Sequence, residues 1–198
     1  NGYNFIALED LYKYIKFNEA LPQNPIVITI DDGYESNYTL AYPLLEKYNA
    51  KASISVVVSN VGKTPGSFPH FDWEQAREME ESGLVNIYSH GLNHTPHNLL
   101  SREELIDSVS AAQAELENNL GPRTVKVFTY PYGTSTEETR QLLRDELGFE
   151  MQLTGFDELV THNTDLSDIK RLNITHQMTG SDIADFINEI KGKMSQTS

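Results

Sequence analysis

The chain has 198 residues, of which 38% are hydrophobic and 22% charged, and 29 acidic against 15 basic residues give a formal net charge of −14. This composition is typical of one folded domain, and its acidic balance argues against nucleic acid and anionic membrane surfaces as partners. The absence of cysteine excludes disulfides, zinc–thiolate sites and thiol nucleophiles, and no apolar run approaches the ~20 residues of a membrane span.

Strand-like runs of β-branched and apolar residues recur along the chain, with helical patterns between them. In chain order, strands are predicted over residues 25–30, 52–58, 84–88, 124–129, 150–154 and 171–174. Helices are predicted after residue 37, from the capping box Asp72–Gln75 to Gly83, from the box Ser101–Glu104 to Gly121, from the box Ser135–Glu138 to Gly148, and around Ile183–Ile190, with a polar tail beyond.

Strands that alternate with helices indicate βαβ units and a parallel sheet. Fewer than eight such units are visible, so the count does not support a complete eightfold barrel. We therefore expect residues 1–198 to form a single α/β domain. The chain begins at Asn1 and not at Met, and we expect it to be a fragment of a longer protein whose leader or membrane anchor is absent from this sequence.

Two carboxylates follow the first predicted strand, at Asp31-Asp32-Gly33. Adjacent side chains at a strand end point to opposite sides, so one carboxylate can hold a metal while its neighbour moves a proton. An ordinary Asp turn is the alternative reading of this pair taken alone.

Two histidines, His90 and His94, follow the strand at 84–88. Imidazoles at i and i+4 can bind one cation from the same face of a helical turn, although surface histidines share this spacing. With an Asp from another strand end they form a three-ligand set that suits Zn²⁺ and leaves positions open for water and substrate.

A turn with the sequence Tyr130-Pro131-Tyr132-Gly133 follows the strand at 124–129. Proline and glycine favour a tight turn that can direct a backbone N–H into the mouth of the site, where it can stabilise an oxyanion. A plain aromatic turn is the alternative.

Together the three motifs resemble those of the polysaccharide deacetylases of carbohydrate esterase family four, the NodB-homology fold. Residues 29–33 resemble the first motif, Thr-Phe-Asp-Asp-Gly; residues 89–94 resemble the second, Ser-His-Thr-x-x-His; and residues 130–133 resemble the core of the third. The ending at residues 171–176 is similar to the Arg-containing last strand of the branch related to poly-N-acetylglucosamine deacetylases.

The resemblance implies an α/β fold, a distorted (β/α) barrel with fewer than eight units, and metal-dependent N-deacetylation of acetylated amino-sugar polysaccharides. It implies Asp31 as the general base. It implies Asp32, His90 and His94 as ligands of one divalent cation, which we expect to be Zn²⁺, with Co²⁺ and Ni²⁺ as alternatives. The Tyr132 N–H is expected to stabilise the oxyanion, and Pro131 to line the substrate site beside Tyr132.

The chain also departs from the family pattern. Thr129 stands where the third motif carries an Arg that supports the catalytic Asp, Gly91 replaces a Thr, and the motif that supplies the histidine acid is missing. We expect His176 to be the general acid. We also expect Arg171 to supply the cation beside Asp31, because a carboxylate without a partner in a desolvated site drifts toward protonation.

Several assignments stay open at this stage. Trp73 is expected either to stack on a sugar or to pack its helix on the core, and His70, His97 and His162 are expected in loops. A catalytically impaired carbohydrate-binding module and an O-acetyl xylan esterase are alternatives to the N-deacetylase. The substrate polymer could be peptidoglycan, poly-N-acetylglucosamine or a chitin-like chain. Such substrates imply an extracellular or cell-envelope location. We expect the protein to be a monomer.

Overall fold

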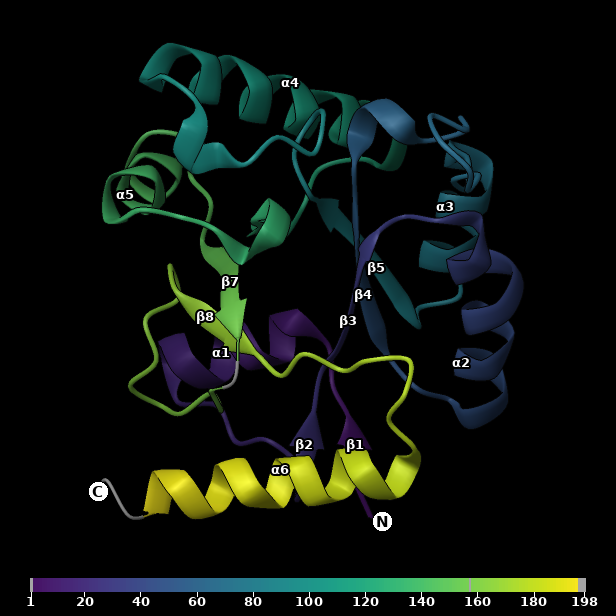
Figure 1. Ribbon diagram of the computed structural model, residues 1–198, viewed down its shortest axis with the longest axis vertical. Helices are drawn as coiled ribbons and strands as arrows, with labels where there is room; N and C mark the ends of the chain where they lie inside the picture. The colour runs from purple at the N-terminus through teal and green to yellow at the C-terminus, as the bar shows by residue number, and fades with distance from the viewer. Residues whose placement is uncertain (1, 157, 196–198) are drawn as a thin grey trace.

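The computed structural model describes residues 2–156 and 158–195, and Figure 1 shows its arrangement. Six parallel strands form one sheet in the order β3-β4-β5-β6-β7-β8. The strands are β3 (Ile28–Asp32), β4 (Ala52–Val56), β5 (Val85–Ser89), β6 (Val127–Thr129), β7 (Met151–Phe156) and β8 (Ile169–Arg171). The sheet curls into a half-barrel with helices around it, as expected of a distorted barrel with fewer than eight units.

Four helices connect successive strands of this sheet from its first strand to its fifth, one helix joins the two strands of a small second sheet, and one helix follows the last strand. The helices are α1 (Leu8–Phe17), α2 (Tyr42–Tyr48), α3 (Trp73–Glu81), α4 (Arg102–Leu120), α5 (Glu137–Asp145) and α6 (Gly180–Ser195). A π-helical turn, η1 (Asn37–Ala41), leads into α2, and three short 3₁₀ turns are η2 (Val58–Asn60), η3 (His97–Leu99) and η4 (Pro131–Gly133). Strands β1 (Asn4–Phe5) and β2 (Pro25–Ile26) pair in parallel, and α6 runs beside them (Figure 1).

The core lies on both faces of the sheet because successive strand residues point to opposite sides. On β5, Ile87 packs with Met79 of α3 and Leu116 of α4. Its neighbour Tyr88 packs on the other face with Leu8 of α1 and with β6, β7 and β8. Helix α1 therefore covers the face opposite to α3 and α4, and the sheet is buried from both sides.

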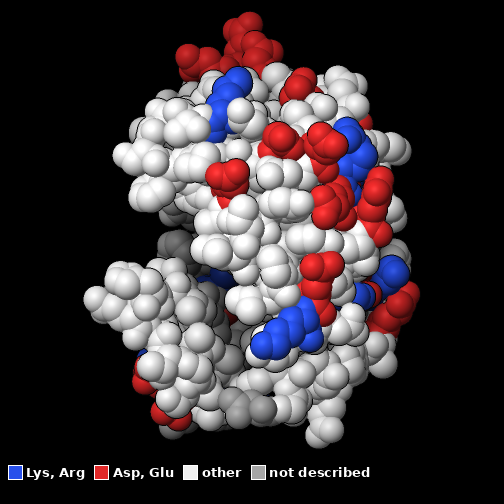
Figure 2. All heavy atoms as spheres, turned by 90° about the vertical axis from the view of Figure 1, so that its right-hand side faces the viewer, with Lys and Arg blue, Asp and Glu red and all other residues white. Residues whose placement is uncertain are grey.

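Two surface features bear on partners. On the face shown in Figure 2, acidic and basic side chains lie next to one another in mixed groups, and wide uncharged areas lie between these groups. Among the residues that the structure describes, no helix has the length and apolar character needed to cross a membrane.

Several predicted boundaries need correction. The first strand is interrupted after Ile26, because the chain there passes from the small sheet into the large one. The α5 capping box joins Thr136 to Thr139 and not Ser135 to Glu138, and the helix ends at Asp145, before Gly148. Helix α6 continues past Ile190 to Ser195, where a polar tail was expected. Arg171 ends β8 and does not begin a strand, so it stands at the carboxyl edge of the sheet.

Other boundaries are confirmed. The capping box Asp72–Gln75 begins α3, and the box Ser101–Glu104 begins α4, which ends at Gly121. Helix α1 was missed because Ala7 precedes it and supplies no side-chain cap.

Candidate active site

The candidate residues gather at the carboxyl ends of β3, β5 and β6. Asp31 and Asp32 are the last two residues of β3, His90 follows β5, and η4 follows β6. The register pairs Asp32 with Val56 of β4, and Val56 with Ser89 of β5. The ends of β3 and β5 are therefore level, and parallel pairing brings residues distant in sequence to one edge of the sheet.

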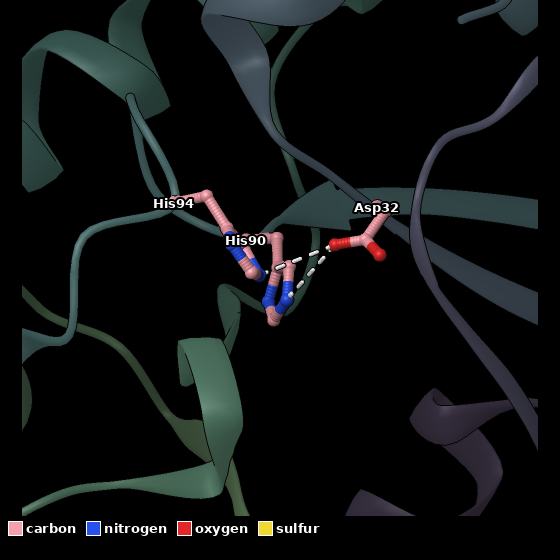
Figure 3. Close-up of side chains that lie close together, drawn as sticks. All are labelled: Asp32, His90 and His94. Carbon is pink, nitrogen blue, oxygen red and sulfur yellow. Dashed lines mark ion pairs between the residues drawn. The ribbon is translucent and has the colours of Figure 1, made fainter. Parts of the chain in front are cut away.

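Asp32, His90 and His94 point toward one another, with the carboxylate on one side and the imidazoles on the other (Figure 3). Asp32 Oδ1 lies 3.6 Å from His90 Nε2 and 3.3 Å from His94 Nε2. The three possible ligand atoms all lie within 4.8 Å of one another. Ligands at the usual distance from a tetrahedral zinc ion stand about 3.3–3.5 Å apart, so the spacing and the donor types fit one divalent cation.

Burial and a hydrogen bond to the backbone fix the orientation of the His90 ring. Its ring is 2% exposed, and Nδ1 lies 2.8 Å from the backbone oxygen of Thr129, to which it donates when Nε2 is the unprotonated nitrogen. Burial lowers the pKa of His90 below its usual value. A neutral ring with Nδ1–H directed at a carbonyl presents Nε2 as a lone-pair donor, which is the arrangement that metal-binding histidines adopt.

The carboxylate of Asp31, the neighbour of Asp32 on β3, pairs with Arg171. Arg171 Nη1 donates to Asp31 Oδ1 at 2.8 Å and Nη2 to Oδ2 at 2.9 Å, and Nη1 also lies 3.2 Å from Thr29 Oγ1. Burial raises the pKa of Asp31, but the hydrogen bonds and charge of Arg171, followed by the charges of His90 and His94, outweigh burial and hold this pKa below its usual value. The structure thus places Arg171 where the sequence analysis expected a cation, and Asp31 is ionised at neutral pH.

Thr129 does not take over the support of Asp31. Its buried hydroxyl forms a 2.7 Å hydrogen bond with Ser55 Oγ on β4, and its carbonyl receives the His90 ring. The contribution of Thr29 and Ser55 was missed by sequence reasoning. The two-residue strand period, which puts Thr29 and Asp31 on one side of β3, is the signal that could have found Thr29.

Backbone strain concentrates at the site. Among the described residues, six other than glycine have positive φ, and three of these are asparagines, which tolerate this region. The other three are Asp32 (φ 75°), His94 (φ 54°) and Tyr132 (φ 59°). Left-handed backbone at such residues costs about 1–3 kcal/mol each and persists where the surrounding structure enforces it, as functional sites do.

The turn after β6 is placed beside His94. Pro131 is buried at the start of η4, while Tyr132 is 59% exposed with its ring centroid 4.6 Å from that of His94. Within the described residues, the Tyr132 N–H donates no hydrogen bond to the protein. This N–H is available to an oxyanion, and the Tyr132 ring can contact a bound sugar.

Two other predicted site residues lie in different surroundings. Trp73, the first residue of α3, is partly buried and packs on the core cluster that contains Phe71 and Met79, which is the packing alternative. His176 is exposed in the turn after β8, and in the part of the chain that the structure describes it makes no contact with Asp31. Its role as general acid stays a prediction.

The expectation that His97 is a solvated loop residue is wrong. Its side chain is 1% exposed and stands edge-on to the rings of Phe128 and Tyr130. A Cβ on Gly91, whose φ is 84°, would meet His97 Cε1 at 2.9 Å. The ring of His97 therefore fills the space that a side chain at position 91 would need, which explains why glycine stands where the family motif has threonine.

Comparison with known proteins agrees with this geometry. A family model described as Polysaccharide deacetylase matches residues 18–151. The chain belongs to the polysaccharide deacetylase family. The putative polysaccharide deacetylase YxkH of Bacillus subtilis is 28% identical to this family member. The alignment covers 96% of the present chain and 66% of YxkH.

Further similarities extend to relatives with more specific names. The poly-beta-1,6-N-acetyl-D-glucosamine N-deacetylase of Staphylococcus aureus is 25% identical over 86% of this chain and 61% of its own. This polysaccharide deacetylase chain thus spans about two thirds of the length of these curated relatives. Among solved structures, IcaB from Ammonifex degensii matches with a TM-score of 0.80 and 26% identity over 93% of this chain and 82% of that one. The Streptococcus pyogenes deacetylase PplD matches in fold with a TM-score of 0.84 and 24% identity, over 93% and 80% of the two chains.

Proposed function

We propose that this chain is a metal-dependent N-deacetylase that removes acetyl groups from an N-acetylglucosamine-containing polysaccharide and releases acetate. The observation that carries the proposal is the placement of an ionised Asp31, paired with Arg171, next to a ligand set formed by Asp32, His90 and His94. A base beside a cation site is what water-dependent hydrolysis of an amide needs.

Asp32, His90 and His94 would hold the cation, and the chemistry that it supplies is polarisation of the carbonyl and a lower pKa for water. The residues of the chain perform the remaining tasks. Asp31 accepts the proton of the attacking water at a carboxylate oxygen. The Tyr132 N–H donates to the oxygen that becomes negative. Arg171 keeps Asp31 ionised and its carboxylate plane fixed.

The leaving amine needs a proton. Asp31, once protonated, is positioned next to the reaction centre and can return that proton. His176 is the other donor that we propose, from the exposed turn after β8.

Two observations support an amino-sugar polymer as substrate. The family is named for polysaccharide deacetylation, and the Staphylococcus aureus relative acts, by its name, on poly-beta-1,6-N-acetyl-D-glucosamine. The net charge of −14 favours a neutral polymer over a polyanion. Such polymers lie outside the cytoplasm, so we propose an extracellular or cell-envelope location.

The ion pair between Arg171 and Asp31 favours an enzyme over an impaired binding module. Loss of the usual third-motif Arg is offset here by a cation from another strand, so the catalytic carboxylate retains its support.

Acetate release from β-1,6- and β-1,4-linked N-acetylglucosamine oligomers and from acetylated xylan tests the proposal. Release from an amino-sugar oligomer, its loss with a chelator and its return with Zn²⁺ are expected. Release from xylan alone would make the chain an O-acetyl esterase. Binding of oligomers with no acetate release at any metal concentration would make it a binding module.

A further inference from the structure

The loop over residues 62–71 is attached to the segment that follows the metal ligand Asp32. The N–H of Glu35 donates to the Pro69 oxygen at 2.8 Å, and the N–H of Phe71 donates to the Gly33 oxygen at 3.2 Å. These bonds run in both directions between the two segments. The loop is therefore held against the site by backbone pairing, although it has no strand or helix of its own.

Three aromatic rings form a cluster where the loop meets this segment. His70 is buried and pairs with Tyr34 through an isolated antiparallel bridge, and their ring centroids are 4.8 Å apart. Phe68 stands edge-on to Tyr34 at 6.0 Å and is 68% exposed. Tyr34 and His70 thus support the ring of Phe68, most of which is exposed to solvent.

This cluster of Tyr34, Phe68 and His70 lies beside the candidate metal ligands. Tyr34 comes two residues after Asp32, and burial together with the Asp32 carboxylate raises the pKa of Tyr34. On the other side of the ligand set, the exposed ring of Tyr132 lies against His94. Asp32 and the histidines approach from opposite sides in Figure 3. The exposed ring of Tyr132 therefore contacts one candidate ligand, and Tyr34, which contacts the exposed ring of Phe68, follows another in sequence.

From this arrangement we propose that Phe68, supported by Tyr34 and His70, is the platform of a second sugar-binding subsite, next to the one in which an acetylated sugar is deacetylated. The inference rests on the proposed function and extends it: the substrate is an oligosaccharide or polysaccharide that lies across the ligand set from Tyr132 to Phe68. The apolar face of a sugar ring suits an aromatic ring, and Phe68 and Tyr132 each expose more than half of their surface.

The experiment compares Phe68→Ala with the unaltered chain on a β-1,6-linked N-acetylglucosamine pentasaccharide and on the disaccharide. Loss of one ring contact is expected to raise KM for the pentasaccharide about tenfold, with kcat nearly unchanged. The preference for the longer substrate, measured as the ratio of the two kcat/KM values, falls by a similar factor. Phe68→Trp restores it, because a larger aromatic face replaces the lost one.

Phe17 provides a matched control. It is 60% exposed at the end of α1 and stands edge-on to Tyr12 at 5.9 Å, so Phe17→Ala removes a similar ring away from the site. Thermal unfolding of both variants checks that folding is intact. Phe17→Ala is expected to leave both KM values unchanged.

A binding measurement keeps this inference separate from the proposed function. In the Asp31→Asn background, calorimetric Kd values for the pentasaccharide are measured with Phe68 present and with Phe68→Ala. A tenfold weaker Kd supports the subsite even if no acetate is ever released, which would overturn only the proposed function. Equal Kd and KM values with and without Phe68, or no binding of the pentasaccharide, would overturn the subsite.

Discussion

Arg171 and Asp31 join the two edges of the half-barrel. Arg171 ends β8 and Asp31 lies near the end of β3, the outermost strands of the sheet, and the two side chains meet through two hydrogen bonds of 2.8 and 2.9 Å. No backbone pairing joins β3 to β8 among the described residues. The charge pair at the proposed catalytic carboxylate is therefore also a link across the open side of the half-barrel.

Replacement of Arg171 is expected to affect the base and not the metal. In Arg171→Met the guanidinium no longer holds the pKa of Asp31 down, so burial raises this pKa and the acid limb of the pH–rate profile moves to higher pH. Turnover at neutral pH falls while metal content stays equal. A pH–rate series with metal analysis measures both effects. An unchanged acid limb with unchanged turnover would show that Arg171 does not act on the pKa of Asp31.

Replacement of Asp31 separates proton transfer from metal binding. Asp31→Asn keeps the size of the side chain but cannot accept a proton, so turnover is expected to fall by ~10²–10⁴-fold or more. The metal content of the purified variant should equal that of the unaltered chain, because Asp31 is not one of the three residues whose ligand atoms lie within 4.8 Å of one another. Turnover at the unaltered rate would mean that another group is the base.

Replacement of a candidate metal ligand is expected to remove the metal as well as the activity. Asp32→Ala, His90→Ala and His94→Ala are each expected to lose bound metal and acetate release together, because each removes one of three ligand atoms. Metal analysis after dialysis against zinc gives the stoichiometry. Retention of one zinc per chain by the double variant His90→Ala, His94→Ala would contradict the assignment.

The contact between Gly91 and His97 predicts a coupled pair. Gly91→Ala is expected to cost more than the ~1–2 kcal/mol of left-handed backbone alone, because its Cβ would lie 2.9 Å from the His97 ring. His97→Ala in the same chain relieves the clash but not the backbone cost. Denaturant unfolding of the two single variants and the double variant measures the coupling, and additive free energies would show that the ring moves aside freely.

His97 also predicts an acid-dependent loss of stability. Burial, and then the charges of His90 and His94, lower the pKa of His97 to about 4, below the ~6.5 of an unfolded chain. The unfolded state thus binds more protons between these values, so this contribution to stability falls as pH drops from ~6.5 to about 4. His97→Leu is expected to flatten the pH dependence of Tm over this interval, whereas an equally steep dependence would assign it to other groups.

The β-branched runs and the helix caps between them predicted the parallel sheet, and the resemblance to the family implied that it curls into a distorted barrel with fewer than eight units. The sequence also predicted which residues gather at the strand ends, since parallel strands bring their carboxyl ends to one edge. What it could not provide was the exact bounds of the strands. Arg171 was expected to begin a strand and instead ends one, a difference that local composition does not encode. The burial of His97 was also hidden, because a histidine in a polar loop carries no periodic signal.

The attachment of the 62–71 loop has a consequence for divergence within the family. The bonds that fasten it to residues 33 and 35 join backbone atoms, which every residue other than proline can supply. Side chains at the exposed tip can therefore vary without disturbing Asp32 or the histidines. We therefore expect relatives that differ at positions such as Phe68 to differ in polymer preference, while the proposed metal ligands and base stay in place.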